Sequence, residues 1–134
     1  MSGSAPFNRT IQAHVPAQAQ AVTGSTVVAV APYAGRVTKV AYFPATTLTG
    51  ANTNSRTLSL VNKGQSGAGT TEIAAKAFVS TVNAPAFDET TLTLDSTDED
   101  LVVAAGDVLA LVSTAVASGL ADPGGLVQIT IART

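Results

Sequence analysis

The chain has 134 residues, of which 12% are charged, with a formal net charge of −2 and no cysteine. This length fits one domain, and a chain without cysteine has neither disulfides nor thiolate metal sites. The seven basic residues are scattered, so the clustered Lys and Arg that nucleic-acid phosphates require are missing. No apolar run approaches the roughly 18 residues of a membrane-spanning helix. We therefore expect no nucleic acid and no membrane among the partners.

The first 25 residues are small and polar, and Ala alternates with Gln over residues 17–21. They hold too few large apolar side chains for a packed element. The segment is either a disordered terminus or an extended arm that orders against a neighbouring subunit. In the second case Phe7, Ile11 and Val15 would anchor the arm. The first ten residues lack the basic and apolar regions of a secretory signal, so we expect synthesis in a cytoplasm.

From residue 25 the chain alternates between short Val- and Thr-rich segments and turn residues, a pattern typical of β-strands. One segment is ambiguous, because Thr71 is placed to cap a helix over residues 72–77. We favour a strand there, since the segment ends in β-branched residues and every neighbour is β-like. The strands predicted before residue 100 are Thr26–Ala31, Gly35–Phe43, Arg56–Asn62, Thr70–Thr81 and Thr90–Leu94.

Two core strands are predicted in the C-terminal region, Val102–Ala132. The continuous apolar run Val108–Val112 indicates a strand covered on both faces. Leu126–Ala132 alternates instead, with Val127, Ile129 and Ile131 on one face, which is typical of a strand with one wet face. Between them, Ser118–Gly125 contains Asp-Pro-Gly-Gly and predicts a shaped surface loop.

About eight short strands with no convincing helix predict an all-β fold, a single-domain antiparallel β-sandwich or jelly-roll-like barrel. In the strand predicted at Gly35–Phe43, Val40 and Tyr42 are expected on one face and Val37, Ala41 and Phe43 on the other. Aromatic residues make up 4% of the chain and Trp is missing, so Val, Leu, Ile and Ala must fill the core. We place the sandwich domain at residues 26–134 and the extended N-terminal arm at residues 1–25.

Candidates for catalysis are weak throughout. His14 is the only histidine and lies in the N-terminal segment, where no fold positions it for a metal or a triad. The acidic loop at residues 95–100 lacks the glycine and ligand spacing of a calcium loop. The glycine-rich stretch Gly64–Gly69 lacks the Lys-Ser or Lys-Thr of a phosphate-binding loop. We therefore expect a protein that is not an enzyme, with no catalytic residue, no cofactor and no metal.

Several strand and turn blocks carry a family resemblance. They are Asn52–Gly64, Gly67–Thr71, Ala105–Leu109, Ser113–Val116 and Gly119–Gly125. In these blocks the chain resembles the small capsid decoration (cement) proteins of tailed bacteriophages. The resemblance spans roughly residues 35–131 and contains no catalytic signature.

The resemblance implies a β-sandwich on the outer capsid surface of a virion. Such a protein contacts the major capsid protein, ties neighbouring capsomers together and is often a homotrimer at quasi-threefold positions. An N-terminal segment often grips the shell. The basic residues Arg9, Arg36, Arg56 and Lys63 are then candidates to meet acidic capsid surface, with Phe7, Ile11 and Val15 as contacts of the arm.

A second hypothesis is a binding module, such as a head- or tail-fibre tip that recognises a cell-surface glycan. It would use the polar loops Thr46–Ser55 and Ser118–Gly125. Sugars stack on aromatic rings, and Tyr33 and Tyr42 are the only tyrosines available. Because exposed aromatic residues are scarce, the structural virion protein is the favoured hypothesis.

Overall fold

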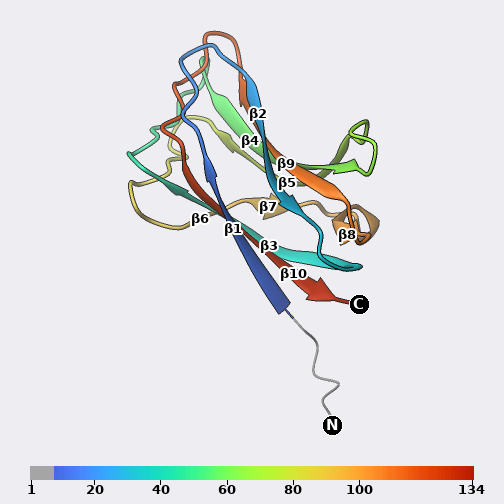
Figure 1. Cartoon of the computed structure of the whole chain (residues 1–134). Helices are drawn as coiled ribbons and strands as arrows, with labels where there is room; N and C mark the ends of the chain where they lie inside the picture. The colour runs from blue at the N-terminus through green and yellow to red at the C-terminus, as the bar shows by residue number, and fades with distance from the viewer. Residues whose placement is uncertain (1–7) are drawn as a thin grey trace.

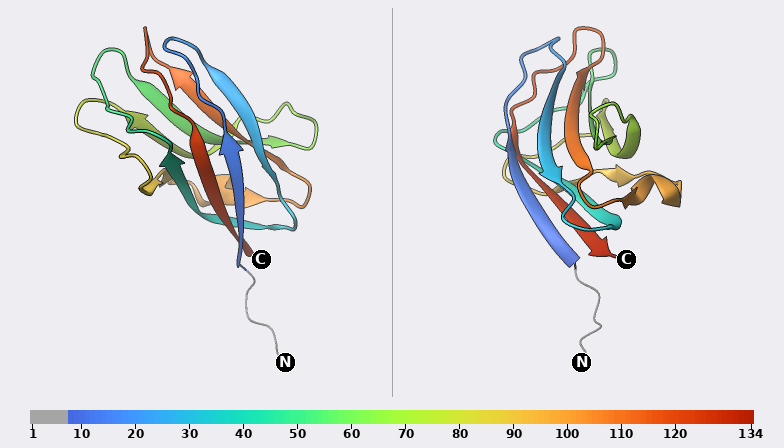
Figure 2. Two further views of the ribbon diagram at one scale, coloured as in Figure 1. Left: turned by 60° about the vertical axis from the view of Figure 1, so that its left-hand side comes forward. Right: turned by 45° about the vertical axis from the view of Figure 1, so that its right-hand side comes forward.

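A computed structural model describes residues 8–134, which form two antiparallel sheets packed face to face (Figures 1 and 2). The first sheet contains β1 (Asn8–Val15), β10 (Gly125–Arg133), β3 (Gly35–Pro44) and the short strands β6 (Thr90–Thr91) and β8 (Val102–Val103). The second contains β2 (Gly24–Val30), β9 (Val108–Ala115), β4 (Arg56–Gly64), β5 (Thr71–Phe78) and β7 (Thr93–Leu94). The helical part of the described chain is one 3-10 turn, η1 (Asp98–Leu101).

Strand pairing in this sandwich is nested along the chain. The first strand pairs with the last, β2 with β9, β3 with β8, and β4 with β5. The chain thus behaves as one long hairpin rolled over two sheets, which is the jelly-roll arrangement. The prediction of an all-β sandwich is therefore confirmed.

The core between the sheets is made almost entirely of aliphatic side chains. Val127, Ile129 and Ile131 on β10 are fully buried, as their alternation predicted. On β9, three consecutive residues (109–111) are buried, which agrees with a strand covered on both faces. The largest buried aromatic side chains are Tyr42 and Phe78.

One predicted face assignment is wrong. Val37 was expected opposite Val40 and Tyr42, yet all three side chains are fully buried. The register explains the difference, because Thr130 pairs with Lys39 while the next residue of β10 pairs with Val37. Thr38 is therefore the extra residue of a β-bulge, which reverses the alternation and turns Val37 toward the core.

The structure also corrects the predicted boundary at residue 25, at least from residue 8 onward. Asn8–Val15 is not a separate arm, because all eight residues pair with β10 of the same chain. Ile11 and Ala13 pack against the core, and Val15 is only 3% exposed. The period-two spacing of these three side chains gives β1 a narrow apolar face, which covers the edge of the sandwich beside β2. Phe7 lies outside the described residues.

Two other segments that were predicted as strands are β-structure, and the second of them is divided between the sheets. The ambiguous segment is the strand β5, not a helix. The short strand predicted at residues 90–94 is divided, because β6 pairs with β3 in one sheet and β7 with β5 in the other. Leu92 at the crossing is 1% exposed and fills the gap between the sheets.

In residues 8–134 no helix has both the length and the apolar character needed to cross a bilayer.

Candidate functional site

Four loops meet at one end of the sandwich, at the upper left of Figure 1. They comprise residues 16–23, 45–55, 79–89 and 116–124, and we call them the loop end. Loops carry most binding functions because the sheets beneath them hold them in place. The loop end is therefore the first surface to consider as a binding site.

Hydrogen bonds between the loops fix their relative positions. Gln18 and Asp122 exchange two backbone hydrogen bonds of 2.9 and 2.8 Å, which join the first loop to the last. Leu48 and Ala84 exchange another pair, of 2.9 and 2.8 Å, between the second and third loops. The Ser118 amide donates to Asn54 Oδ1 at 3.2 Å and joins the last loop to the second. The loop end is thus a preformed surface.

This surface carries little charge. Asp122 is only 2% exposed, so the exposed charge of the four loops is confined to Asp88 and Glu89, at the β6 end of the third loop. Apolar side chains are exposed there instead, with Phe87 84% exposed. Of the seven large hydrophobic side chains exposed in the described chain, four belong to the loop end, namely Val22, Val79, Phe87 and Val116. Depletion of charge with exposed aromatic and aliphatic groups is typical of the core of a protein interface.

A buried polar network supports the loop end from below. The Asp122 carboxylate accepts the Tyr42 hydroxyl at 2.7 Å, the Ser113 hydroxyl at 2.7 Å and the Gly124 amide at 3.0 Å. These bonds satisfy a carboxylate that the fold removes from water. Burial, together with the adjacent carboxylate, raises the pKa of Tyr42 far above its ordinary value, so the hydroxyl remains a donor.

Arg56 belongs to the same network and is fully buried. Its guanidinium donates to the carbonyl oxygens of Leu120, Ala19 at 3.0 Å and Ser113 at 3.3 Å, and to Ser113 Oγ at 2.9 Å. Burial lowers the pKa of Arg56, while the charge of Asp122 opposes that shift. The prediction that Arg56 meets a capsid surface is therefore wrong, because its donors are used to hold two loops from within.

The other predicted contact residues do not converge on one place. Val15 is in the core and Ile11 is half-buried on the inner face of β1. Lys63 lies near the end of β4, and Arg36 forms an ion pair with Asp98. Arg9 is exposed at the start of β1. None of the predicted contact residues belongs to the four loops of the loop end, which is distinguished by its exposed apolar side chains.

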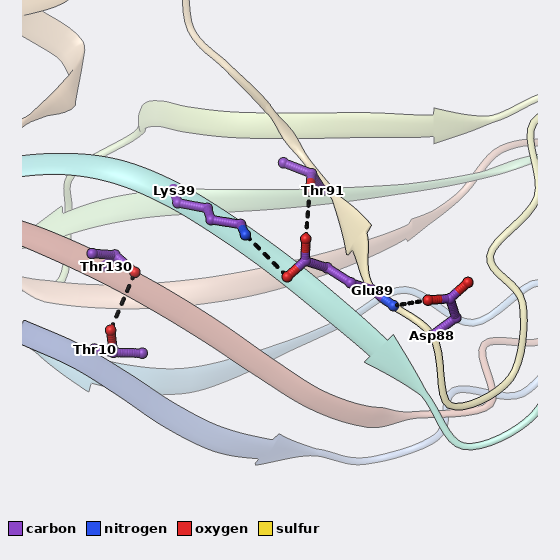
Figure 3. Close-up of polar contacts among 6 residues, drawn as sticks. All are labelled: Thr10, Lys39, Asp88, Glu89, Thr91 and Thr130. Carbon is purple, nitrogen blue, oxygen red and sulfur yellow. Dashed lines mark hydrogen bonds and ion pairs between the residues drawn. The ribbon is translucent and has the colours of Figure 1, made fainter.

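The outer face of the β1–β10–β3 sheet is polar, and its side chains bond to one another (Figure 3). Lys39 Nζ lies 3.0 Å from Glu89 Oε2, and the Thr91 hydroxyl donates to Glu89 Oε1 at 3.5 Å. Across β1 and β10, the Thr10 and Thr130 hydroxyl oxygens are 3.3 Å apart. These five side chains are thus bonded to one another across the strands.

The two loops of the glycan hypothesis, Thr46–Ser55 and Ser118–Gly125, do lie together within the loop end. Neither tyrosine presents a ring to a sugar on these loops, because Tyr42 contacts Asp122 from within the core and Tyr33 lies beside the start of β1. In residues 8–134 no group of three or more His, Asp or Glu side chains is placed to hold a metal ion.

Comparison of the chain with protein-family models, with curated proteins and with solved structures finds no match in any of the three.

Proposed function

We propose that this protein is a structural virion protein that decorates a tailed-phage capsid, with the loop end resting on the major capsid protein. The observation that carries the proposal is the preformed loop end, from which Phe87 and three valines project and whose exposed charge is limited to Asp88 and Glu89. A flat protein lattice is a partner that such a surface fits, because burial of apolar area is the main favourable term in association. The sequence blocks that resemble decoration proteins support the same partner.

The proposed role is to bridge neighbouring capsomers on the outer surface. A protein that binds only the expanded shell stabilises that shell by mass action. A homotrimer at a quasi-threefold position would present three loop ends at once, so three weak contacts would act as one strong attachment. The sandwich serves as a rigid support, since its aliphatic core and nested pairing hold the four loops in place.

The test is to mix the purified protein with undecorated capsids and to measure cosedimentation, followed by electron microscopy of the decorated shells. Phe87→Ala and the double variant Val79→Ser/Val116→Ser should each weaken binding about tenfold or more, because they remove exposed apolar contacts. The matched control is Val27→Ser/Val102→Ser, which changes two valines that are 65% and 51% exposed outside the loop end. It should bind as the unchanged protein does.

The outcomes separate the two parts of the proposal. If the unchanged protein binds no capsid and adds no density to the outer shell, the decoration function is refuted. If it binds but the loop-end variants bind equally well, attachment uses another surface. Thermal unfolding of each variant excludes a loss of fold as the cause, since all five side chains are solvent-exposed.

A further inference from the structure

A pocket of about 380 Å³ lies where the start of β1 meets the end of β10, and it is lined by Asn8, Arg9, Tyr33 and Arg133. This is the lower end of the sandwich in Figure 1, away from the loop end. The Arg133 guanidinium lies 5.4 Å from the centre of the Tyr33 ring. The Tyr33 hydroxyl donates to the Ile131 carbonyl at 3.0 Å, which fixes the ring. The pocket therefore has an ordered aromatic wall and two cationic groups.

The two arginines share one face of the sheet. Arg9 pairs with Ile131, so Arg133 is its diagonal neighbour, at a Cα separation of about 7–8 Å. Both side chains are exposed, and in residues 8–134 neither guanidinium has an acidic side chain within ion-pair distance. Residues 1–7 contain no Asp or Glu. Two neighbouring guanidinium groups without a counter-charge favour a carboxylate, which can accept hydrogen bonds from both.

A matching excess of negative charge lies in the turn formed by residues 95–100, which we call the acidic turn. It holds Asp95, Asp98, Glu99 and Asp100, and Arg36 pairs with only one of them, Asp98. A hydrogen bond with Asp95, together with the charges of Asp95 and Glu99, raises the pKa of Asp100. Four carboxylates within six residues, of which Asp98 has a cationic partner, leave this turn with an excess of negative charge that a cationic partner would offset.

The pocket and the acidic turn are at different places on the same molecule. In Figure 2, η1 projects from the side of the sandwich, while the start of β1 and the end of β10 lie together at its lower end. We propose that the pocket binds carboxylates of the acidic turn from a second copy of this chain. The contact joins two different patches, so it is head-to-tail, and such contacts close into rings or extend into chains. This inference concerns contact between copies and does not depend on capsid binding.

Sedimentation velocity over a range of protein concentrations tests the contact. The unchanged protein should self-associate, and the association should weaken as NaCl rises from about 0.05 M to about 0.5 M, where the screening length falls to about 4 Å. Arg9→Glu/Arg133→Glu should raise the dissociation constant about tenfold or more, because like charges would then face each other. Glu99→Lys/Asp100→Lys should have the same effect, and the fourfold variant that combines both pairs should regain association.

The matched control is Lys63→Glu/Lys76→Glu, which makes the same change in net charge at two basic residues outside the pocket. It should associate within about twofold of the unchanged protein. A protein that stays monomeric at low salt, or a pocket variant that associates normally, overturns the inference. If the pocket variant loses capsid binding but not self-association, the pocket belongs to the capsid contact instead. A monomer that still decorates capsids would refute this contact and leave the proposed function intact.

Discussion

Replacing Asp122 with Asn tests whether the buried network holds the loop end in place. The side chain keeps its size but loses its charge at a position that is 2% exposed. One oxygen can still accept from Tyr42 and from the Gly124 amide, which both bond to Oδ1 in the unchanged protein. At the other position an amide donor replaces Oδ2, so the Ser113 hydroxyl loses its acceptor.

The expected loss follows from these three hydrogen bonds. A hydrogen bond to a charged group contributes about 1.5–3 kcal/mol and a neutral one about 0.5–1.5 kcal/mol, so weakening or losing three bonds costs about 3 kcal/mol in total. The Arg56 guanidinium also loses the nearby negative charge that offsets its burial. Since domains of this kind are stable by about 5–15 kcal/mol, the variant should fold but with much reduced stability.

Urea unfolding followed by circular dichroism measures the free energy of unfolding. The control is Asp88→Asn, which removes a charge from an exposed side chain that accepts from the neighbouring Glu89 amide, and it should change stability by less than about 0.5 kcal/mol. Ser113→Ala, alone and combined with Asp122→Asn, should give non-additive losses because both act on one network. A loss below about 1 kcal/mol for Asp122→Asn, or full additivity, would refute the reasoning.

Two further predictions concern the ends of the fold. Deletion of residues 2–15 removes a strand that pairs with β10, together with the buried Val15. In urea unfolding, the truncated protein should lose cooperativity or be less stable by more than about 4 kcal/mol. Unchanged urea unfolding would contradict this prediction. Hydrogen bonds from the Ala104 amide and Asn62 lower the pKa of Asp107 below its ordinary 3.8. Charged Asp107 therefore stabilises the fold at pH values above 3.8, the pKa of the unfolded chain. This stabilisation is lost as the pH falls from 3.8 through the lowered pKa of the folded protein. Asp107→Asn should cost about 1–2 kcal/mol at pH 7 and progressively less below pH 3.8, as measured by urea titrations at each pH; a difference independent of pH would contradict the assignment.

The charge distribution along the sandwich gives a common basis for both binding proposals. One end presents loops with exposed apolar side chains, the opposite end presents Arg9 and Arg133, and the acidic turn projects from the side of the sandwich. Apolar contact supplies affinity, whereas charge complementarity fixes register and partner choice. A protein built in this way can use one end to attach to a lattice and the other to contact its own copies.

The class of fold and most of the strands could be predicted from local sequence patterns. Alternation placed Val127, Ile129 and Ile131 in the core, because a period of two leaves one face for the interior whatever the strand pairs with. Clusters of turn residues likewise located the loops. Both signals are local, since they depend only on a residue and its near neighbours in the chain.

Contacts between segments that are distant in the chain could not be predicted in this way. The alternation of Ile11, Ala13 and Val15 is weak, and it becomes a strand because β10 offers hydrogen bonds and a core edge to cover. In the sequence nothing distinguishes Arg56 from a surface arginine. It is buried because Leu120, Ser113 and Ala19, from three separate segments, supply its hydrogen-bond acceptors. The loop end exists because nested pairing brings four separate loops to one end of the sandwich, and no local pattern records that pairing.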